Sequence, residues 1–349
     1  MSDSQTADIR SLTLAELKAR IEELGEPGYR AKQIFSWLHR KNAVGWEEMS
    51  DLPAKLRERL ITEVPLREAP VVRRQESAID GTVKVLFELF DGNLIESVLM
   101  HYRFGYSVCI SSQAGCRMGC AFCASTLSGL SRNLTAGEML SQVYAFEREL
   151  SEGERVSHVV VMGSGEPMEN YDEVIRFFRL LAAPEGHKLS LRNMTVSTCG
   201  IIPGIRRLSQ EGIPVNLAIS LHAPNDEIRS QIMPVARKYP MEELLDACRD
   251  YFALTGRRLT WEYALIRDIN DREEHARELA DRIRGITGVV NLIPVNPVKE
   301  RGLHEPDRDG VRHFQKVLNE HGTEATIRRT LGRDIDGACG QLRRKLVEE

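Results

Sequence analysis

The 349-residue chain lacks the features that mark a membrane, disulfide-rich or strongly basic protein. It has no apolar run near the roughly 20 residues that a membrane-spanning helix needs. Its N-terminus has no basic segment followed by an apolar stretch, so no secretory signal is predicted and a cytoplasmic location is expected. Only 6% of residues are aromatic and the net charge is −4. Composition therefore does not predict nucleic-acid binding, which would have to rely on local basic patches.

Cysteine is also scarce, with seven residues, but three of them stand in one short stretch. Cys116, Cys120 and Cys123 follow the spacing C-x3-C-x2-C, and no fourth cysteine is close enough to complete a local set of four. A structural zinc site usually has four protein ligands, and an ordinary ferredoxin cluster has four thiolates. Three thiolates in one loop instead suit a [4Fe-4S] cluster whose fourth iron is open to a substrate. A partial zinc site and three unrelated buried cysteines are the alternatives.

Short apolar runs alternate with amphipathic stretches from residue 106 onward. This alternation predicts a parallel sheet with helices on its outside, and six such strands predict a partial barrel with ligands at the C-terminal strand ends. Expected strands are 106–110, 157–162, 192–197, 214–220, 258–264 and 289–293. Expected helices lie near 135–150, 171–182, 201–211, 241–254 and 272–285.

The part of the chain before this alternating region has a different pattern. Residues 9 to about 65 show helical spacing in three segments, and Gly25 with the following Glu26-Pro27-Gly28 run ends the first. Two apolar runs then flank Asp91-Gly92, which is a β-hairpin signal. We therefore expect residues 1–70 to form a helical accessory domain and residues 71–349 to form the catalytic domain, with the hairpin at its start.

The cysteine spacing is the signature of radical S-adenosylmethionine (SAM) enzymes. Its wider context, from Cys109 through Cys123 and on to Arg132-Asn133-Leu134, resembles the RNA adenine-C2 methyltransferases, which modify 23S ribosomal RNA and tRNA. The resemblance runs over nearly the whole chain. It implies an α/β fold, the radical-SAM partial (β/α)6 barrel, with a small N-terminal helical domain and a β-hairpin extension. It also implies a [4Fe-4S] cluster and two molecules of SAM per turnover.

A SAM pocket is expected at the ends of the predicted strands. The glycine turn before Pro167 is a weak signal alone, but it matches the family's Gly-Glu-Pro motif. That match implies that Gly165 and Glu166 hold the amino end of SAM. Residues at three later strand ends also match the subfamily, although any one of them alone would suit a capping role. They are Ser197, Ser220, Leu221, His222 and Asn296.

The resemblance further implies three catalytic residues. Cys339 would accept a methyl group from one SAM and, after hydrogen abstraction by a radical from a second SAM, would deliver it to adenine C2. Glu96 would remove the C2 proton, and Cys109 would release the product by forming a Cys109–Cys339 disulfide. The residue types and their positions alone also allow other roles for these three side chains. Either cysteine would suit packing, Cys109 would also suit a cluster ligand, and Glu96 would suit the solvent side of its strand.

The implied RNA partners are 23S rRNA, at the peptidyl transferase centre, and tRNA, next to the anticodon. The resemblance also implies a cytoplasmic monomer that has no membrane partner. It further implies a low-potential electron donor such as flavodoxin. The first domain is locally basic, which fits either a solvated helix surface or an RNA-docking surface. The basic residues are Arg30, Lys32, Arg40 and Lys41.

The rival functions are adenine-C8 methylation, a radical or electron-transfer protein that does not methylate, and a module with structural zinc.

Overall fold

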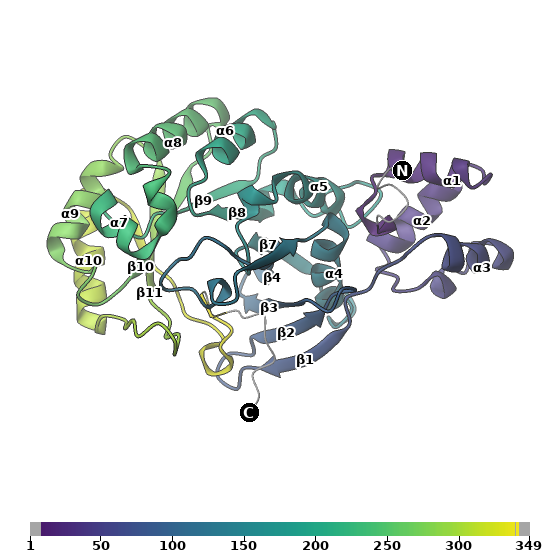
Figure 1. The fold of residues 1–349 in the computed structure, drawn as a ribbon, viewed down its shortest axis with the longest axis horizontal. Helices are drawn as coiled ribbons and strands as arrows, with labels where there is room; N and C mark the ends of the chain where they lie inside the picture. The colour runs from purple at the N-terminus through teal and green to yellow at the C-terminus, as the bar shows by residue number, and fades with distance from the viewer. Residues whose placement is uncertain (1–7, 339, 342–349) are drawn as a thin grey trace.

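A computed structural model describes residues 8–338 and 340–341 (Figure 1). Its core is a ten-stranded mixed sheet in the order β1-β2-β3-β4-β7-β8-β9-β10-β11-β12. Strands β1 to β4 pair antiparallel. From β4 onward every neighbouring pair is parallel. The chain is thus the α/β partial barrel that the sequence predicted, extended at one edge by the hairpin.

The six predicted barrel strands are all present, each within two residues of its expected bounds. Short apolar runs made them recognisable, such as Val159-Val160-Val161 of β7 and Leu217-Ala218-Ile219 of β9. The observed strands are β4 (Gly105–Ile110), β7 (Val156–Val161), β8 (Met194–Thr198), β9 (Asn216–Ser220), β10 (Leu259–Leu265) and β11 (Gly288–Pro294).

The five predicted barrel helices are also present. Thr135 begins the first of them with a capping box, in which its hydroxyl accepts from Glu138 N–H while the Glu138 carboxylate accepts from Thr135 N–H. The observed helices are α4 (Ala136–Glu147), α5 (Tyr171–Leu181), α6 (Ile202–Gln210), α8 (Met241–Thr255) and α9 (Glu273–Arg282).

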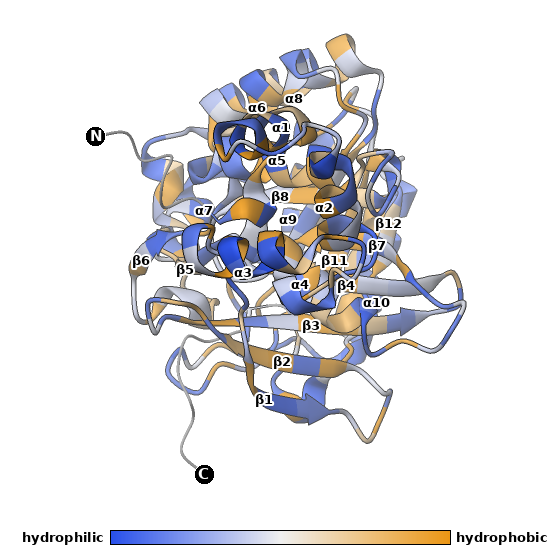
Figure 2. Ribbon diagram, turned by 90° about the vertical axis from the view of Figure 1, so that its right-hand side faces the viewer, coloured by the Kyte–Doolittle hydropathy of each residue, from blue (hydrophilic) through white to orange (hydrophobic). Residues whose placement is uncertain are grey.

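Several elements were not predicted, and most carry little apolar pattern. The first strand of the sheet starts with two valines but continues Arg-Arg-Gln-Glu, and Figure 2 shows its hydrophilic end. Two short strands also pair beside the barrel as a separate two-stranded sheet. The additional elements are β1 (Val71–Glu76), β5 (Gln113–Gly115), β6 (Leu130–Asn133), α7 (Asp226–Ile232), α10 (Arg308–Glu320) and β12 (Ala325–Ile327).

The hairpin consists of β2 (Val83–Glu88) and β3 (Leu94–Tyr102), and it extends the barrel through β4. Its two faces have different partners because side chains alternate along a strand. Phe87 on one face lies edge-on to Phe146 of α4, at 6.4 Å between ring centres. Val98 and Met100 on the other face cluster with Cys109 of β4. The second face therefore borders the interior of the barrel.

Three helices precede the hairpin and lie beside α4, at the end of the molecule away from β10 and β11 (Figure 1). They are α1 (Leu14–Glu23), α2 (Arg30–His39) and α3 (Ala54–Glu63). A buried arginine, Arg10, ties this region together by donating to Ala43 O (3.0 Å) and pairing with Glu68. His39 Nδ1 lies 3.0 Å from the hydroxyl of Tyr144 on α4. Within residues 8–338 and 340–341, no helix is long and apolar enough to cross a membrane.

Candidate functional site

The three clustered cysteines lie in the loop that leads from β4 to α4. Close backbone contacts fix this loop. Cys116 N–H donates to Gly129 O (3.1 Å), and Ala121 N–H donates to Ile232 O (2.8 Å). Gly115 has φ +81°, and a Cβ there would lie 1.9 Å from Gly129 O, so only glycine fits. The loop backbone is therefore held in place by the protein itself.

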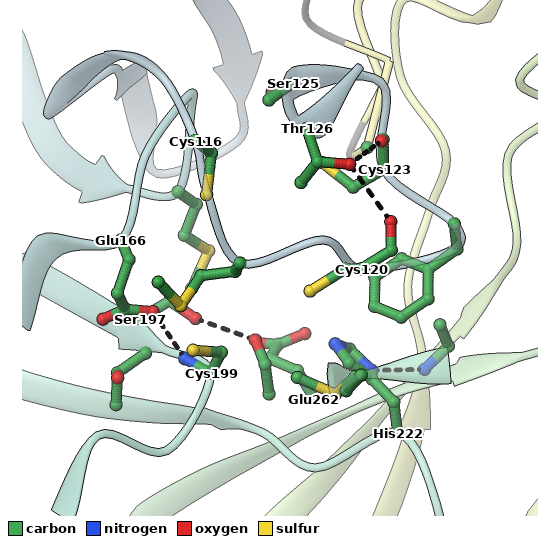
Figure 3. A pocket seen from close by; sticks show the side chains of 18 of the residues that line it. Cys116, Cys120, Cys123, Ser125, Thr126, Glu166, Ser197, Cys199, His222 and Glu262 are labelled. Atoms are coloured by element: carbon green, nitrogen blue, oxygen red, sulfur yellow. Dashed lines mark hydrogen bonds between the residues drawn. The ribbon is translucent and has the colours of Figure 1, made fainter. Parts of the chain in front are cut away.

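All three cysteines line one cavity at the C-terminal ends of the barrel strands (Figure 3). Cys116 and Cys120 are buried and Cys123 is half-buried. Burial raises the pKa of Cys116 to about 12 and also raises the pKa of Cys120. Thiols in such a place ionise readily only when a cation is bound beside them, because burial disfavours an isolated charge.

The arrangement of these thiols suits an iron–sulfur cluster better than a single metal ion. Among the residues that the structure describes, no three His, Cys, Asp or Glu side chains gather as ligands for one ion. A [4Fe-4S] cluster does not need such convergence, because each thiolate binds a different iron. Three thiols around one cavity, with no local fourth cysteine in the sequence, fit that donor set. Cys116, Cys120 and Cys123 are the residues that would hold the cluster.

The turn after β7 forms one wall of this first cavity. The Glu166 carboxylate is buried and accepts from Cys199 N–H (2.8 Å) and Met168 N–H (3.0 Å). Burial raises the pKa of Glu166, and these hydrogen bonds oppose the rise. Gly165 has φ +111°, and a Cβ there would lie 2.6 Å from the Gln113 side chain. The predicted pair Gly165–Glu166 is thus fixed in position by its neighbours.

The later strand ends contribute hydroxyl and imidazole groups to the same cavity. The hydroxyls of Ser197 and Ser220 lie 3.4 Å apart. His222 Nδ1 accepts from Ala264 N–H (2.8 Å), so a neutral ring carries its proton on Nε2. Burial, with the nearby Arg229 charge, lowers the pKa of His222 to about 3. His222 is therefore a neutral group at the cavity wall.

The remaining two predicted pocket residues, Asn296 and Leu221, differ in whether they line the first cavity. Asn296 lines the first cavity. Leu221 is fully buried in the main core and is absent from the cavity lining, so its side chain does not face a ligand there. Its carbonyl accepts from Arg229 Nε (3.3 Å), while Arg229 Nη2 donates to Cys199 O (2.7 Å). Arg229 thus links the backbone at the ends of β8 and β9, and Leu221 contributes its carbonyl to this link.

A second cavity adjoins the first along the inner face of β3 and β4. It contains Cys109, a buried cysteine near the end of β4. Both cavities share part of their lining, namely Met162, Ile293, Asn296 and Arg328. Ala338 lines the second cavity and Gly340 lines the first. The predicted residue between them in the sequence, Cys339, lies outside the described residues.

Glu96 is buried in β3 and does not face solvent. Its carboxylate pairs with Lys84 Nζ at 3.2 Å. Val98, two residues further along β3 and so on the same face, lines the second cavity. Glu96 itself is not among the residues that line either cavity. Lys84 Nζ also donates to Asp336 O (3.4 Å), which links the hairpin to the C-terminal segment.

A second carboxylate, which was not predicted, lines the first cavity. Glu262 is buried on β10 beside Ser220, its register partner, and accepts from Asn291 Nδ2 (2.8 Å). Burial raises the pKa of Glu262. The only sequence signal was one acidic residue in an apolar strand. Cys199 also lines the cavity, whereas Cys248 lies in the main core.

The predicted basic residues of the N-terminal region lie on and just after α2. Lys32, Arg40 and Lys41 are exposed. Arg30 Nη1 donates to Gln33 Oε1 (2.9 Å), and Lys41 Nζ lies 3.4 Å from the centre of the Trp37 ring. Within the described ranges, none of the four basic side chains forms an ion pair with a carboxylate. Their charge is not neutralised by the surrounding described residues.

Two family descriptions match the chain. The Radical SAM superfamily matches residues 110–280, and the ribosomal RNA large subunit methyltransferase N-terminal domain matches residues 7–65. A crystal structure of a radical SAM methyltransferase from Sphaerobacter thermophilus has a TM-score of 0.94 and 46% identity. That similarity covers 97% of this chain and 99% of the other.

Curated relatives are similar over nearly their full lengths. A protein of Lachnoclostridium phytofermentans is 50% identical over 348 residues, which cover 100% of this chain and 97% of the relative. A protein of Symbiobacterium thermophilum is 50% identical over 96% of this chain and 90% of the relative. Both are named probable dual-specificity RNA methyltransferase RlmN. The chain therefore belongs to the RlmN family of RNA methyltransferases, within the radical SAM superfamily.

Proposed function

We propose that the protein methylates C2 of adenosine in 23S rRNA, at the peptidyl transferase centre, and in tRNA, next to the anticodon. The observation that carries the proposal is the adjoining pair of cavities. One has the three clustered cysteines and the other has Cys109. The names of the relatives, dual-specificity RNA methyltransferases, support two kinds of RNA substrate.

Cys116, Cys120 and Cys123 would hold the [4Fe-4S] cluster, and SAM would occupy the rest of the first cavity. When bound, the cluster supplies the electron that cleaves SAM to a carbon radical. The buried carboxylate and the fixed glycine turn, Glu166 and Gly165, would receive the amino end of SAM. Ser197, Ser220, His222 and Asn296 would contact the rest of SAM, with Leu221 contributing only its backbone.

The chemistry of adenine explains why a cysteine carrier is needed. C2 lies between two ring nitrogens and is electron-poor, so it does not attack the methyl group of SAM as a nucleophile. A carbon radical can instead add to the ring. Cys339 would carry the methyl group as a thioether, using one SAM for methylation and a second SAM for activation. Its sequence neighbours Ala338 and Gly340 line the two cavities, which supports this role.

Two further residues would complete the reaction. Glu96, which pairs with Lys84, would remove the C2 proton after a rearrangement that brings its carboxylate to the base. The Cys109 thiolate would attack the sulfur of Cys339 and break its bond to the methylene carbon, which would take up a proton to become the methyl group on C2. The unpaired electron of the adduct would be returned to the bound cluster, and a Cys109–Cys339 disulfide would remain. External thiols would reduce that disulfide. The enzyme would act in the cytoplasm as a monomer, with flavodoxin or a similar protein as electron donor.

The cluster assignment predicts a specific loss of iron. Cys120→Ala should abolish the brown colour of the anaerobically purified protein and its cleavage of SAM, because one iron loses its thiolate. Cys248→Ala is the matched control, since Cys248 is equally buried but lies in the core. Iron and sulfide analysis checks both variants. Full iron content in Cys120→Ala would remove Cys120 from the site.

The N-terminal helical region, proposed as a domain over residues 1–70, would dock RNA through Arg30, Lys32, Arg40 and Lys41. Replacing all four with Gln should weaken RNA binding and reduce its dependence on salt, because fewer counterions are released. Each lost phosphate contact on a single strand should lower the log–log salt slope by about 0.7. An unchanged slope with normal iron content would assign the RNA surface to the barrel instead.

The proposed roles of Cys109 and Cys339 predict that their alanine variants fail at different steps of the reaction. Cys109→Ala should stall after addition to RNA, because the carrier remains but the attacking thiol is gone. The protein should then stay linked to RNA through a thioether that survives denaturation and reducing agent. Nuclease digestion and peptide mass spectrometry should find a nucleotide on segment Asp334–Leu342.

Cys339→Ala provides the comparison, since it should bind the cluster yet form neither product nor adduct. Cys248→Ala should turn over normally. Normal turnover by Cys109→Ala would refute the resolving role. Loss of iron from Cys109→Ala would instead make Cys109 a part of the cluster site.

A further inference from the structure

An aromatic group lies at the turn between β3 and β4, and one of its members, Tyr102, lines the second cavity. Tyr102 and Phe104 stack with ring centres 4.8 Å apart and planes 9° apart. His158 of β7 lies edge-on to Phe104, at 4.7 Å. Phe104 is 61% exposed. These three residues, Tyr102, Phe104 and His158, are called the aromatic platform below.

Phe104 differs from the other exposed aromatic residues in what covers its ring. Phe90 is 55% exposed, but the guanidinium of Arg67 lies 3.8 Å from its ring centre. Tyr29 has Arg30 4.8 Å from its ring centre. Within the described ranges no cation lies over Phe104, whose described ring partners are aromatic. Its exposed side is therefore available for stacking with a flat ligand.

The platform continues into the cavity that contains Cys109. Tyr102, Met100, Val98 and Cys109 all line that cavity. Val98 is the register partner of Cys109, and Tyr102 is four residues further along β3. At about 3.4 Å per residue, Tyr102 lies about 14 Å along β3 from Val98, and so at a similar distance from Cys109. Stacked bases are spaced about 3.4 Å apart, so this distance corresponds to several nucleotides. The platform is too far from Cys109 to hold the reacting base itself.

The charges around the platform favour a polyanion. Arg103 lies within the turn, and Arg329 lines the second cavity. Both are exposed, and neither has an ion-pair partner in the part of the chain that the structure describes. By contrast, Arg176, Arg179 and Arg207 on the outer helices all pair with carboxylates. Two unneutralised guanidinium groups beside a stacking surface suit the phosphates of a nucleic acid.

A nearby carboxylate is turned to the other face of the sheet. Glu154 accepts from the hydroxyl of Tyr106, whose ring stacks on His101 at 4.6 Å. His101 precedes Tyr102 in β3, so the two side chains point to opposite faces. The acidic group is therefore separated from the platform by the sheet.

We propose that the aromatic platform binds a nucleotide of the RNA substrate that flanks the target base, by stacking its base on Phe104. Arg103 and Arg329 bind neighbouring phosphates. The RNA strand then runs from the platform along the second cavity, and the target nucleotide, unstacked from its neighbours, reaches Cys109. This inference rests on the proposed function and adds a contact surface to it.

Three variants test the platform in the full-length, cluster-containing protein. Phe104→Leu keeps an apolar side chain but removes the aromatic face. Phe104→Trp keeps that face, and Leu254→Ala alters an equally exposed apolar residue, 62% exposed, on α8. The probe is 23S rRNA and tRNA from cells that lack this enzyme. RNA binding, the KM for RNA, and SAM binding without RNA are measured for each variant.

Phe104→Leu should weaken RNA binding and raise KM between about fivefold and 150-fold, the range measured for loss of one base–aromatic stack. Phe104→Trp and Leu254→Ala should stay within about threefold of the parent protein, within the scatter of surface substitutions. SAM binding should be unchanged in all of them. Arg103→Gln and Arg329→Gln should each lower the salt slope by about 0.7.

Unchanged RNA binding by Phe104→Leu, in a protein that still methylates RNA, would overturn the platform and leave the proposed function intact. Loss of SAM binding together with RNA binding would also overturn it, because the residue would then act through the fold. Failure of the parent protein to bind or methylate either RNA would instead refute the proposed function itself.

Discussion

The hydrogen bonds of one buried serine, Ser111, hold together the parts of the candidate site. Its hydroxyl donates to Glu96 O (2.7 Å) on β3 and accepts from Ser164 N–H (2.9 Å) in the turn after β7. Its backbone N–H and carbonyl both bond to the Gln142 amide on α4, at 2.8 and 3.0 Å. Both residues are fully buried, so each group needs these partners. One short network thus fixes the hairpin, the end of β4 and the Gly165–Glu166 turn relative to one another.

This arrangement separates two kinds of chemistry within one continuous space. The first cavity combines buried thiols with the half-buried Cys123, two buried carboxylates and a neutral histidine. The second cavity is bordered by Val98, Met100 and Leu331 around Cys109. The shared residues, among them Met162 and Asn296, mark the passage between the two cavities.

Much of the fold could be predicted because its strands are short apolar runs that alternate along the chain with amphipathic helices. The site was harder to predict, because it depends on pairing between distant strands. Nothing near Glu96 in the sequence indicates that Lys84 will lie 3.2 Å away, since that contact comes from the register of β2 and β3. Leu221 stands beside His222 in sequence, yet its side chain points into the core. Glu262 is a single acidic residue in an apolar strand, and the sequence does not indicate that Ser220 is its register partner.

The most direct test of the account is to identify the methylated carbon in RNA. Nucleosides from 23S rRNA and tRNA of cells with and without the gene should be compared by mass spectrometry, with synthetic 2-methyladenosine and 8-methyladenosine as standards. The account predicts that 2-methyladenosine disappears from both RNAs when the gene is deleted and returns when it is restored. Loss of 8-methyladenosine instead, or no change in either nucleoside, would contradict it.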